Sequence, residues 1–420
     1  MTLLLFGLLF LLFFINVPIA IALGVSAGVV LIIQDSVPLV AIMQRMFSSV
    51  DSFPLLAIPF FIIAGKLMEV GGISRRLIHL ADVIFGRMRG GLGIVSIMAC
   101  AFFAALSGSA AATTAAVGSI MIPAMVKKGY DRDFSTAIQA TGGTIGIMIP
   151  PSVPLVLYGV AAGASISDLF IAGVVPGLFV TATLAMLVYI ISLRKGYGGG
   201  EKYNIKDFFK ALVDSVFALL MPVIILGGIY GGFFTPTEAA LVAVVYGFIV
   251  GFIIYREIKI KDLLEIFRDS IQITSVIMFI MVGASVFGYY LTREKIPAQV
   301  TELMLGISDN WIVILLIINL ILLVAGAFME TAAAIIILTP ILVPVAQALN
   351  IDLIHFGIIM IVNLAIGFIT PPVGLNLFVA ANIAGTRFEG VVRAVIPFII
   401  IMIVDVLIIS FVPGFSLILL

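Results

Sequence analysis

The chain has few of the residues on which most catalytic and metal-binding chemistry depends. Its 420 residues contain one cysteine, Cys100, and two histidines, His79 and His355, far apart in the sequence. This excludes a disulfide framework and gives no cluster of metal ligands. A GxxxxGK[ST] phosphate-binding loop is also missing, because the Gly-Lys pair at Gly65-Lys66 lies within an apolar run. We therefore expect neither ATP hydrolysis nor another enzymatic activity.

Charged residues are also scarce, whereas apolar residues are abundant. Only 10% of the residues are charged, 63% are hydrophobic, and the mean hydropathy is +1.32. Several stretches carry no charge over about 18 residues, which is the length a helix needs to cross the hydrocarbon of a bilayer. These properties predict an all-α polytopic membrane protein in contact with lipid, without a nucleic-acid partner. The first basic residue is Arg45, so we expect no cleaved signal peptide.

Landmarks in the first half of the chain recur in the second half in the same order. Pro18 aligns with Pro236 and, after a short insertion, the double proline Pro150-Pro151 aligns with Pro371-Pro372. Chance would account for one such pair, but several matched landmarks in one order favour a duplication. We place the two repeats at residues 1–198 and 205–420, with a polar, glycine-rich linker at residues 199–204.

The number of crossings in each half decides whether the repeat is parallel or inverted. We expect five per half, which inverts the second half. One tilted helix over residues 2–34 is the alternative, but Asn16-Val17-Pro18 favours a turn. Five crossings also gather most lysines and arginines on the side of Lys127-Lys128, as the positive-inside rule requires. The predicted crossings are 2–16, 18–34, 54–72, 134–160 and 168–193, then 213–230, 236–255, 271–291, 353–383 and 395–419.

Two further apolar segments are too long for one crossing. Segment 91–127 has basic residues at both ends and should therefore return to the side from which it enters, and segment 309–350 takes the same place in the second half. We expect two re-entrant helical hairpins, with a small, hydroxyl-bearing tip at residues 107–109 and an acidic tip at Glu330-Thr331. A close helix–helix contact is the competing interpretation of these small residues.

Double prolines interrupt the crossings at 134–160 and 353–383. We expect both helices to break, at Pro150 and Pro151 and at Pro371 and Pro372, leaving carbonyls that lipid cannot satisfy. A cation and a hairpin tip at the same depth can satisfy such carbonyls, and half-helix N-termini can face an anion. Water or a simple kink would explain one break. Two breaks that each follow a hairpin favour a transport site.

The local chemistry suggests ligand roles, with sodium as the coupling ion and no other cofactor. Back-bonding within a helix is the competing interpretation of each hydroxyl, and a structural hydrogen bond is that of Glu330. Glu330 should face the protein interior or a cavity, because an acid in lipid is costly. The predicted sodium ligands are Ser107, Ser109, Gly146, Ile149, Thr331, Gly367 and Thr370. The predicted substrate-binding residues are Ser109, Thr113, Ser152, Glu330 and Asn376.

Other polar features are predicted to be structural. Thr235-Pro236-Thr237-Glu238 fits a helix-capping box, with Thr235 as the N-cap and Glu238 at the third helical position. The stretches 38–50 and 258–268 are amphipathic and lie at equivalent points of the two halves. They predict horizontal interface helices that brace a scaffold, with solvated loops as the alternative.

The motifs GSAAATTAAVGSIMIP, GTIGIMIPPS, GGFFTPTEAA, METAAAIIILTPILVP and IGFITPPVGLNLFV together resemble one family. They are similar to the large membrane subunit of tripartite ATP-independent periplasmic (TRAP) transporters, over essentially the whole chain. The resemblance implies a fold related to divalent-anion/sodium symporters and an elevator-type motion of a transport domain against a scaffold. It also places the sodium and substrate sites at the two hairpin tips and the two breaks.

The resemblance further implies a function and partners. It implies sodium-coupled uptake of an organic acid, such as a C4-dicarboxylate, sialic acid or a similar carboxylate, across the bacterial inner (cytoplasmic) membrane. The implied partners are a periplasmic substrate-binding protein and a small four-helix membrane subunit, which we expect as a separate polypeptide. A stand-alone sodium/anion symporter without a binding protein is the alternative. A channel and a membrane-embedded enzyme fit the sequence less well.

Overall fold

Helices form all the regular secondary structure of the described chain. The computed structural model describes residues 1–35, 37–199, 203–308 and 310–420, and within these ranges there are helices and no strands. Nine helical segments in these ranges are long and apolar enough to cross a membrane. Many large apolar side chains lie exposed on the outside, among them Leu3, Phe14 and Phe233. This surface suits lipid, which confirms the predicted all-α polytopic fold.

Within its described residues, the first half contains ten α-helices. Proline or glycine stands at most of the junctions, where each residue either ends a helix or starts the next one. The elements are α1 (Thr2–Phe14), α2 (Ile19–Ile33), α3 (Leu39–Ser48), η1 (Phe53–Leu56), α4 (Ala57–Val70), α5 (Ile73–Phe85), α6 (Gly91–Ser107), α7 (Ala110–Lys127), α8 (Arg132–Thr144), η2 (Ile145–Ile147), α9 (Val153–Ala162) and α10 (Ile166–Lys195).

The second half repeats this order, with one long helix in place of α3 and α4. It ends in a short additional helix, α20. The elements are α11 (Ile205–Tyr230), α12 (Pro236–Phe248), η3 (Ile249–Ile254), α13 (Ile260–Arg293), α14 (Ile296–Ile307), α15 (Trp311–Phe328), α16 (Thr331–Ala348), α17 (Leu353–Gly367), α18 (Leu375–Ala384), α19 (Phe388–Phe411) and α20 (Gly414–Leu417).

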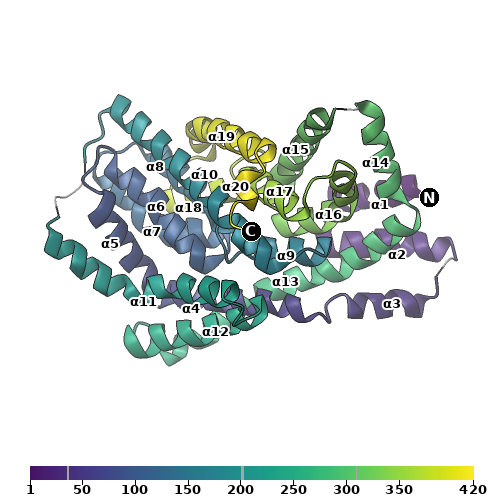
Figure 1. Ribbon diagram of the computed structural model, residues 1–420, viewed down its shortest axis with the longest axis horizontal. Helices are drawn as coiled ribbons and strands as arrows, with labels where there is room; N and C mark the ends of the chain where they lie inside the picture. Colours follow the sequence, from purple (N-terminus) through teal and green to yellow (C-terminus); the bar gives the residue numbers. More distant parts are fainter. Residues whose placement is uncertain (36, 200–202, 309) are drawn as a thin grey trace.

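The two halves pack against each other in reciprocal pairs. Helix α2 packs on α13 and α12 packs on α4, while α9 packs on α16 and α18 packs on α7. At the α2–α13 contact, a Cβ added to Gly283 would lie 2.1 Å from the carbonyl oxygen of Ala20, so the two backbones touch. In Figure 1, α11, α12, α4, α13 and α3 run along the lower edge, and the hairpins and broken helices lie above them.

Both hairpins and both helix breaks are present. Helices α6 and α7 turn at residues 107–109, hereafter tip 1, and α15 and α16 turn at residues 329–331, hereafter tip 2. The crossing that follows each hairpin is interrupted: α8 and α9 are separated by residues 145–152, hereafter break 1, and α17 and α18 by residues 368–374, hereafter break 2. The Pro150-Pro151 and Pro371-Pro372 peptide bonds, one in each break, are both cis.

One predicted scaffold element is wrong. The stretch 258–268 was expected to form a horizontal helix of its own, but it is continuous with the following crossing in α13. No proline or glycine interrupts α13 before Gly283, so nothing ends the helix there. In the first half, Pro54 and the extended residue Ser52 separate α3 from α4. The predicted helix near residues 38–50 is therefore present, whereas its counterpart is merged.

Sequence analysis missed two connecting helices. Helix α5 leads into the first hairpin and α14 leads into the second, so they are equivalent elements of the two halves. The repeat boundaries at 198 and 205 stay a prediction. Helix α10 ends at Lys195 and α11 begins at Ile205, and the linker residues 200–202 and the predicted hairpin start at 309 lie outside the described residues.

The capping box at the start of α12 is confirmed. The Thr235 hydroxyl accepts a hydrogen bond from the backbone N–H of Glu238 at 3.3 Å. The Glu238 carboxylate accepts in return from the backbone N–H of Thr235 at 2.8 Å. Pro236 occupies the first helical position, where its missing N–H costs nothing. This polar motif is therefore structural, since it caps the start of α12.

Candidate functional site

A cavity of about 160 Å³ lies where the two tips meet the lower layer of helices. Ser107 and Ser109 of tip 1 line one part of it, and Glu330 and Thr331 of tip 2 line another. Residues of break 1, break 2, α4, α9, α13 and α18 complete the wall. The two tips come from opposite halves of the chain, so the duplication itself builds this cavity.

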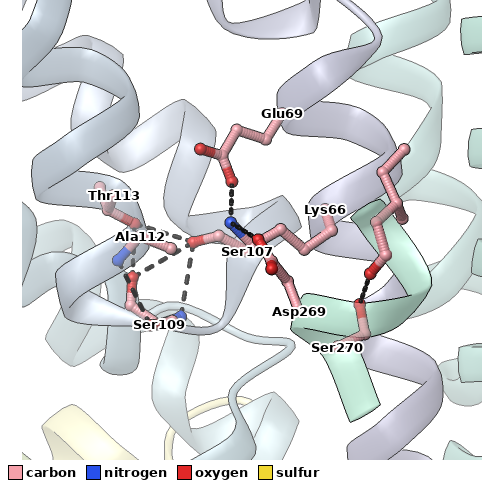
Figure 2. Close-up of polar contacts among 9 residues, drawn as sticks. Lys66, Glu69, Ser107, Ser109, Ala112, Thr113, Asp269 and Ser270 are labelled. Carbon is pink, nitrogen blue, oxygen red and sulfur yellow. Dashed lines mark hydrogen bonds and ion pairs between the residues drawn. The ribbon is translucent and has the colours of Figure 1, made fainter. Parts of the chain in front are cut away.

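Tip 1 is closed by hydroxyl groups. The hydroxyl oxygens of Ser107 and Thr113 lie 2.8 Å apart, and the Thr113 hydroxyl donates to the carbonyl oxygen of Ser109 at 2.8 Å (Figure 2). The Ser109 hydroxyl caps α7 by accepting from the backbone N–H of Ala112 at 3.4 Å. Gly108 turns the chain with a φ of +59°, a conformation that favours glycine. Three oxygen atoms are thereby gathered at the start of α7.

Tip 1 lies directly against break 1. A Cβ added to Gly146 would come within 2.5 Å of both the Ser109 carbonyl oxygen and the Thr113 hydroxyl. A Cβ added to Gly108 would lie 2.9 Å from the carbonyl oxygen of Pro151. Glycine at both positions therefore lets the two backbones meet. The predicted sodium ligands Ser107, Ser109 and Gly146 are brought together by this contact.

Tip 2 is capped by a carboxylate. Glu330 is the N-cap of α16, and its Oε2 atom accepts from the backbone N–H groups of Ala332 at 2.9 Å and Ala333 at 3.3 Å. This is the structural hydrogen bond that competed with a ligand role. The Glu330 side chain is nevertheless exposed and lines the cavity, so the cap does not remove it from the site. Thr331, the first residue of α16, lies beside it and is buried.

Tip 2 and break 2 also meet through glycines. A Cβ added to Gly367 would lie 2.2 Å from the backbone of Gly326, near the end of α15. The Thr370 hydroxyl donates to the carbonyl oxygen of Ile366 at 2.8 Å, which is the helix back-bonding weighed against a sodium role. The carbonyl oxygen of Thr370 takes no part in this hydrogen bond, so it is the Thr370 atom that could serve as a ligand.

Two predicted substrate residues point into the protein. The Ser152 hydroxyl is buried and donates to the carbonyl oxygen of Ile147 at 2.7 Å, so it satisfies a carbonyl freed by break 1. The Asn376 side chain is also buried and donates to the carbonyl oxygen of Ala140, in α8 of the other half, at 3.0 Å. Its own oxygen has no hydrogen-bond partner among the described residues. Neither residue lines the cavity, and neither does Thr113.

Sequence analysis missed the charged part of the cavity wall. Lys66 and Glu69 of α4 line the cavity, and their charged groups lie 3.1 Å apart. From the sequence, Lys66 is half of a Gly-Lys pair that fails to form a phosphate loop, and it lies inside the predicted crossing 54–72. The available signal was its position inside an apolar crossing, where an ionisable residue is by default a functional candidate.

The fold and this cavity define a class of protein. Two inverted halves each place a re-entrant tip against an unwound stretch of a crossing helix, and all four elements surround one polar cavity. This is the arrangement in which membrane carriers hold substrates and ions at the interface of inverted repeats. Within the described residues, no three His, Cys, Asp or Glu side chains come together as a metal site. The chain is thus a membrane transport protein.

Comparison with known proteins gives the family. The family described as the DctM component of the tripartite ATP-independent periplasmic transporter matches residues 6–415. The chain is 45% identical to the C4-dicarboxylate TRAP transporter large permease protein of Pseudomonas aeruginosa, covering 94% of this chain and 93% of that protein. It is 39% identical to the sialic acid TRAP transporter large permease protein of Vibrio cholerae, with 97% and 96% covered. The chain therefore belongs to the family of TRAP transporter large permeases.

Two further matches bear on the chain's length and its fold. An isethionate TRAP transporter permease protein of Oleidesulfovibrio alaskensis is 47% identical over 98% of this chain, but the match spans 65% of that longer protein. A solved structure of the Alcanivorax borkumensis YdaH transporter, described as having an unusual topology, matches with a TM-score of 0.64 at 14% identity. That match covers 90% of this chain and 89% of the other. It supports the fold.

Proposed function

We propose that this chain is the permease subunit of a sodium-coupled secondary transporter that imports an organic acid across the bacterial inner membrane. In this proposal a periplasmic binding protein delivers the acid and a small four-helix membrane subunit completes the transporter. The observation that carries the proposal is the meeting of two tips and two breaks, from inverted halves, around one cavity. Family membership supports the assignment of partners.

Sodium suits the oxygen atoms at the two tips. Unwound backbone carbonyls commonly coordinate sodium in carriers of this kind. At tip 1 the Ser107 hydroxyl, the Thr113 hydroxyl and the Ser109 carbonyl already lie within hydrogen-bonding distance of one another. The two hydroxyls could keep their protons, turn them away and direct oxygen lone pairs at a cation, together with the carbonyl oxygen. The unpartnered oxygen of Asn376 is a further acceptor that a cation would satisfy. In this proposal Ile149, Gly367, Thr331 and Thr370 complete the two sets of ligands.

An anionic substrate suits the same cavity. Helices α7 and α16 both begin there, and the N-terminal end of a helix carries partial positive charge. The relatives are named for isethionate, C4-dicarboxylates and sialic acid, which share an acidic group. We propose a carboxylate or sulfonate as substrate, with Ser109 and Glu330 as the predicted substrate-binding residues that line this cavity.

Transport would follow an elevator mechanism. The hairpins, the broken helices, α10 and α19 would move as one transport domain against a scaffold built from α1, α2, α4, α11, α12 and α13. The binding free energies of sodium and acid would be coupled reciprocally, so that each raises the affinity for the other. The cavity lies between these two groups of helices, which is where such a movement would expose the site.

The test is uptake into proteoliposomes that contain both membrane subunits, with the binding protein added outside. Isethionate, a C4-dicarboxylate and sialic acid are offered separately under an imposed inward sodium gradient. We expect saturable uptake of at least one acid that stops when the gradient is dissipated. Uptake without the binding protein would instead indicate a stand-alone symporter, and uptake unaffected by sodium would overturn the coupling.

A further inference from the structure

Lys66 places a positive charge in the cavity wall on the scaffold side. Its ammonium lies 3.1 Å from the Glu69 carboxylate, one turn along α4, and 3.9 Å from the Asp269 carboxylate of α13 (Figure 2). One quarter of the Lys66 side chain is exposed. The ammonium is therefore held in place but not enclosed, because the longer contact leaves room for another anionic group.

The residue before Lys66 brings tip 1 next to this charge. A Cβ added to Gly65 would lie 3.3 Å from the Cα atom and 3.4 Å from the carbonyl oxygen of Ser107. The backbone of α4 therefore packs on the turn of the first hairpin at Gly65, and Lys66 follows directly. Lys66 and Ser107 both line the cavity. A substrate held at tip 1 would thus have the ammonium as a neighbour.

The balance of charge around the cavity makes Lys66 significant for an anion. It is the one basic residue among the described residues that line the cavity, whereas Glu69 and Glu330 are acidic. Without Lys66, the wall would present negative side chains alone to an incoming acid, and like charges at short range repel. An ammonium is also a compact donor that accommodates different anion geometries.

We propose that Lys66 is an anion-binding residue of the scaffold, which contacts the carboxylate or sulfonate of the substrate while tip 1 lies against α4. This inference rests on the function proposed above. Glu69, on the same helix, positions the ammonium. Asp269 is the weaker partner, and the substrate anion takes its place at the ammonium. The acid would then bridge the transport domain and the scaffold in this conformation.

The proposal predicts opposite effects for the two partners of one ion pair. Lys66→Gln should raise the KM for the acid about tenfold or more, since contacts between charged groups contribute strongly to binding. Lys66→Arg keeps the charge and should remain close to the unaltered protein. Asp269→Asn removes the competing carboxylate and should lower the KM. Lys128→Gln, at an exposed lysine beyond the end of α7, is the matched control.

The measurement is the KM for acid uptake in the complete reconstituted transporter, with thermal unfolding of each variant as the check on folding. A purely structural ion pair would make Lys66→Gln and Asp269→Asn shift the KM in the same direction or leave it unchanged, and either result overturns the proposal. Should Lys66→Gln fail to fold, the KM values of Lys66→Arg and Asp269→Asn test the proposal. A KM that is not lowered in Asp269→Asn would then overturn it. If the unaltered transporter shows no sodium-driven uptake, the proposed function itself is rejected.

Discussion

The two hairpin tips share a backbone plan but differ in their side-chain chemistry. Tip 1 is closed by neutral hydroxyls, with Thr113 bonded to both Ser107 and Ser109. Tip 2 is closed by a carboxylate, because Glu330 caps α16 with two backbone hydrogen bonds. Each tip meets its broken helix through glycine, at Gly146 in the first half and Gly367 in the second.

The comparison of the tips shows which features the two halves share and which differ between them. Close backbone contact is common to both halves, since it requires small residues at fixed places. The polar groups are not common to both, because a carboxylate from one tip and hydroxyls from the other line the same cavity. A symmetric frame therefore presents an asymmetric binding surface, and substitutions can test which part each half contributes.

The largest effect is expected where tip and break touch. In Gly146→Ala and Gly367→Ala the added carbon would lie 2.5 Å and 2.2 Å from backbone atoms of the facing segment, which cannot move aside as a flexible side chain would. We expect each variant to lose uptake by more than about tenfold, because overpacking of this kind costs about 1–3 kcal/mol. Gly227→Ala, in α11 with no atom within 4 Å of the added carbon, is the control. Normal uptake in either variant would show that the tip and break need not touch.

The next effect concerns the sodium ligands proposed at tip 1. Thr113→Val removes the hydroxyl that joins Ser107 to Ser109 while keeping the side-chain shape. We expect the sodium concentration for half-maximal uptake to rise about tenfold, the size expected from losing a strong polar contact. The matched variant is Ser119→Ala, which removes a hydroxyl bonded to the carbonyl of Ala116 on the same helix. Thr331→Val shows whether tip 2 contributes equally, and an unchanged sodium requirement in Thr113→Val would exclude this ligand.

A smaller effect is expected for the charge at tip 2. Glu330→Gln removes the negative charge but keeps an oxygen that can still accept from the N–H of Ala332. We expect uptake to fall by roughly three- to tenfold with stability nearly unchanged. Asp352→Asn is the control, because Asp352 caps α17 in the same manner and does not line the cavity. Full uptake in Glu330→Gln would leave Glu330 with its capping role alone.

The smallest effect is expected at the start of α12. Thr235→Ala breaks the capping box of α12, which should lower the free energy of unfolding by about 1 kcal/mol. Uptake at saturating sodium and acid should stay unchanged, since the motif lies away from the cavity. Thermal unfolding and uptake of the same preparation measure both quantities. A loss of uptake in fully folded protein would place this cap within the transport mechanism.

The hairpins and breaks could be predicted because their signals are local. Proline prevents a continuous helix wherever it stands, and basic residues at both ends of segment 91–127 mark a segment that returns. The continuity of 258–268 with the rest of α13 was not predicted, because here no local signal distinguishes the two halves clearly. The two repeats are alike in pattern at this point, but the interruption that Pro54 marks in the first half is absent from the second.

The inward-facing site residues could not be predicted, because long-range packing decides their direction. Asn376 bonds to Ala140 in the opposite half, and Lys66 pairs with Asp269 in the same way. Ser152 follows a break as expected, yet its hydroxyl bonds to Ile147 and not to the cavity. The sequence pattern places these residues on or beside predicted crossings, and the packing of the two halves determines which way each one points.

The reciprocal packing of the halves has a consequence for biosynthesis. Helices α2, α4, α7 and α9 leave the ribosome before α13, α12, α18 and α16, which are the helices that cover them. The early segments must therefore stay in the bilayer with these surfaces unmatched until the covering helices of the second half are made, first α12 and α13 and later α16 and α18. A chain terminated after the first repeat would leave α2, α4, α7 and α9 without the helices that pack on them.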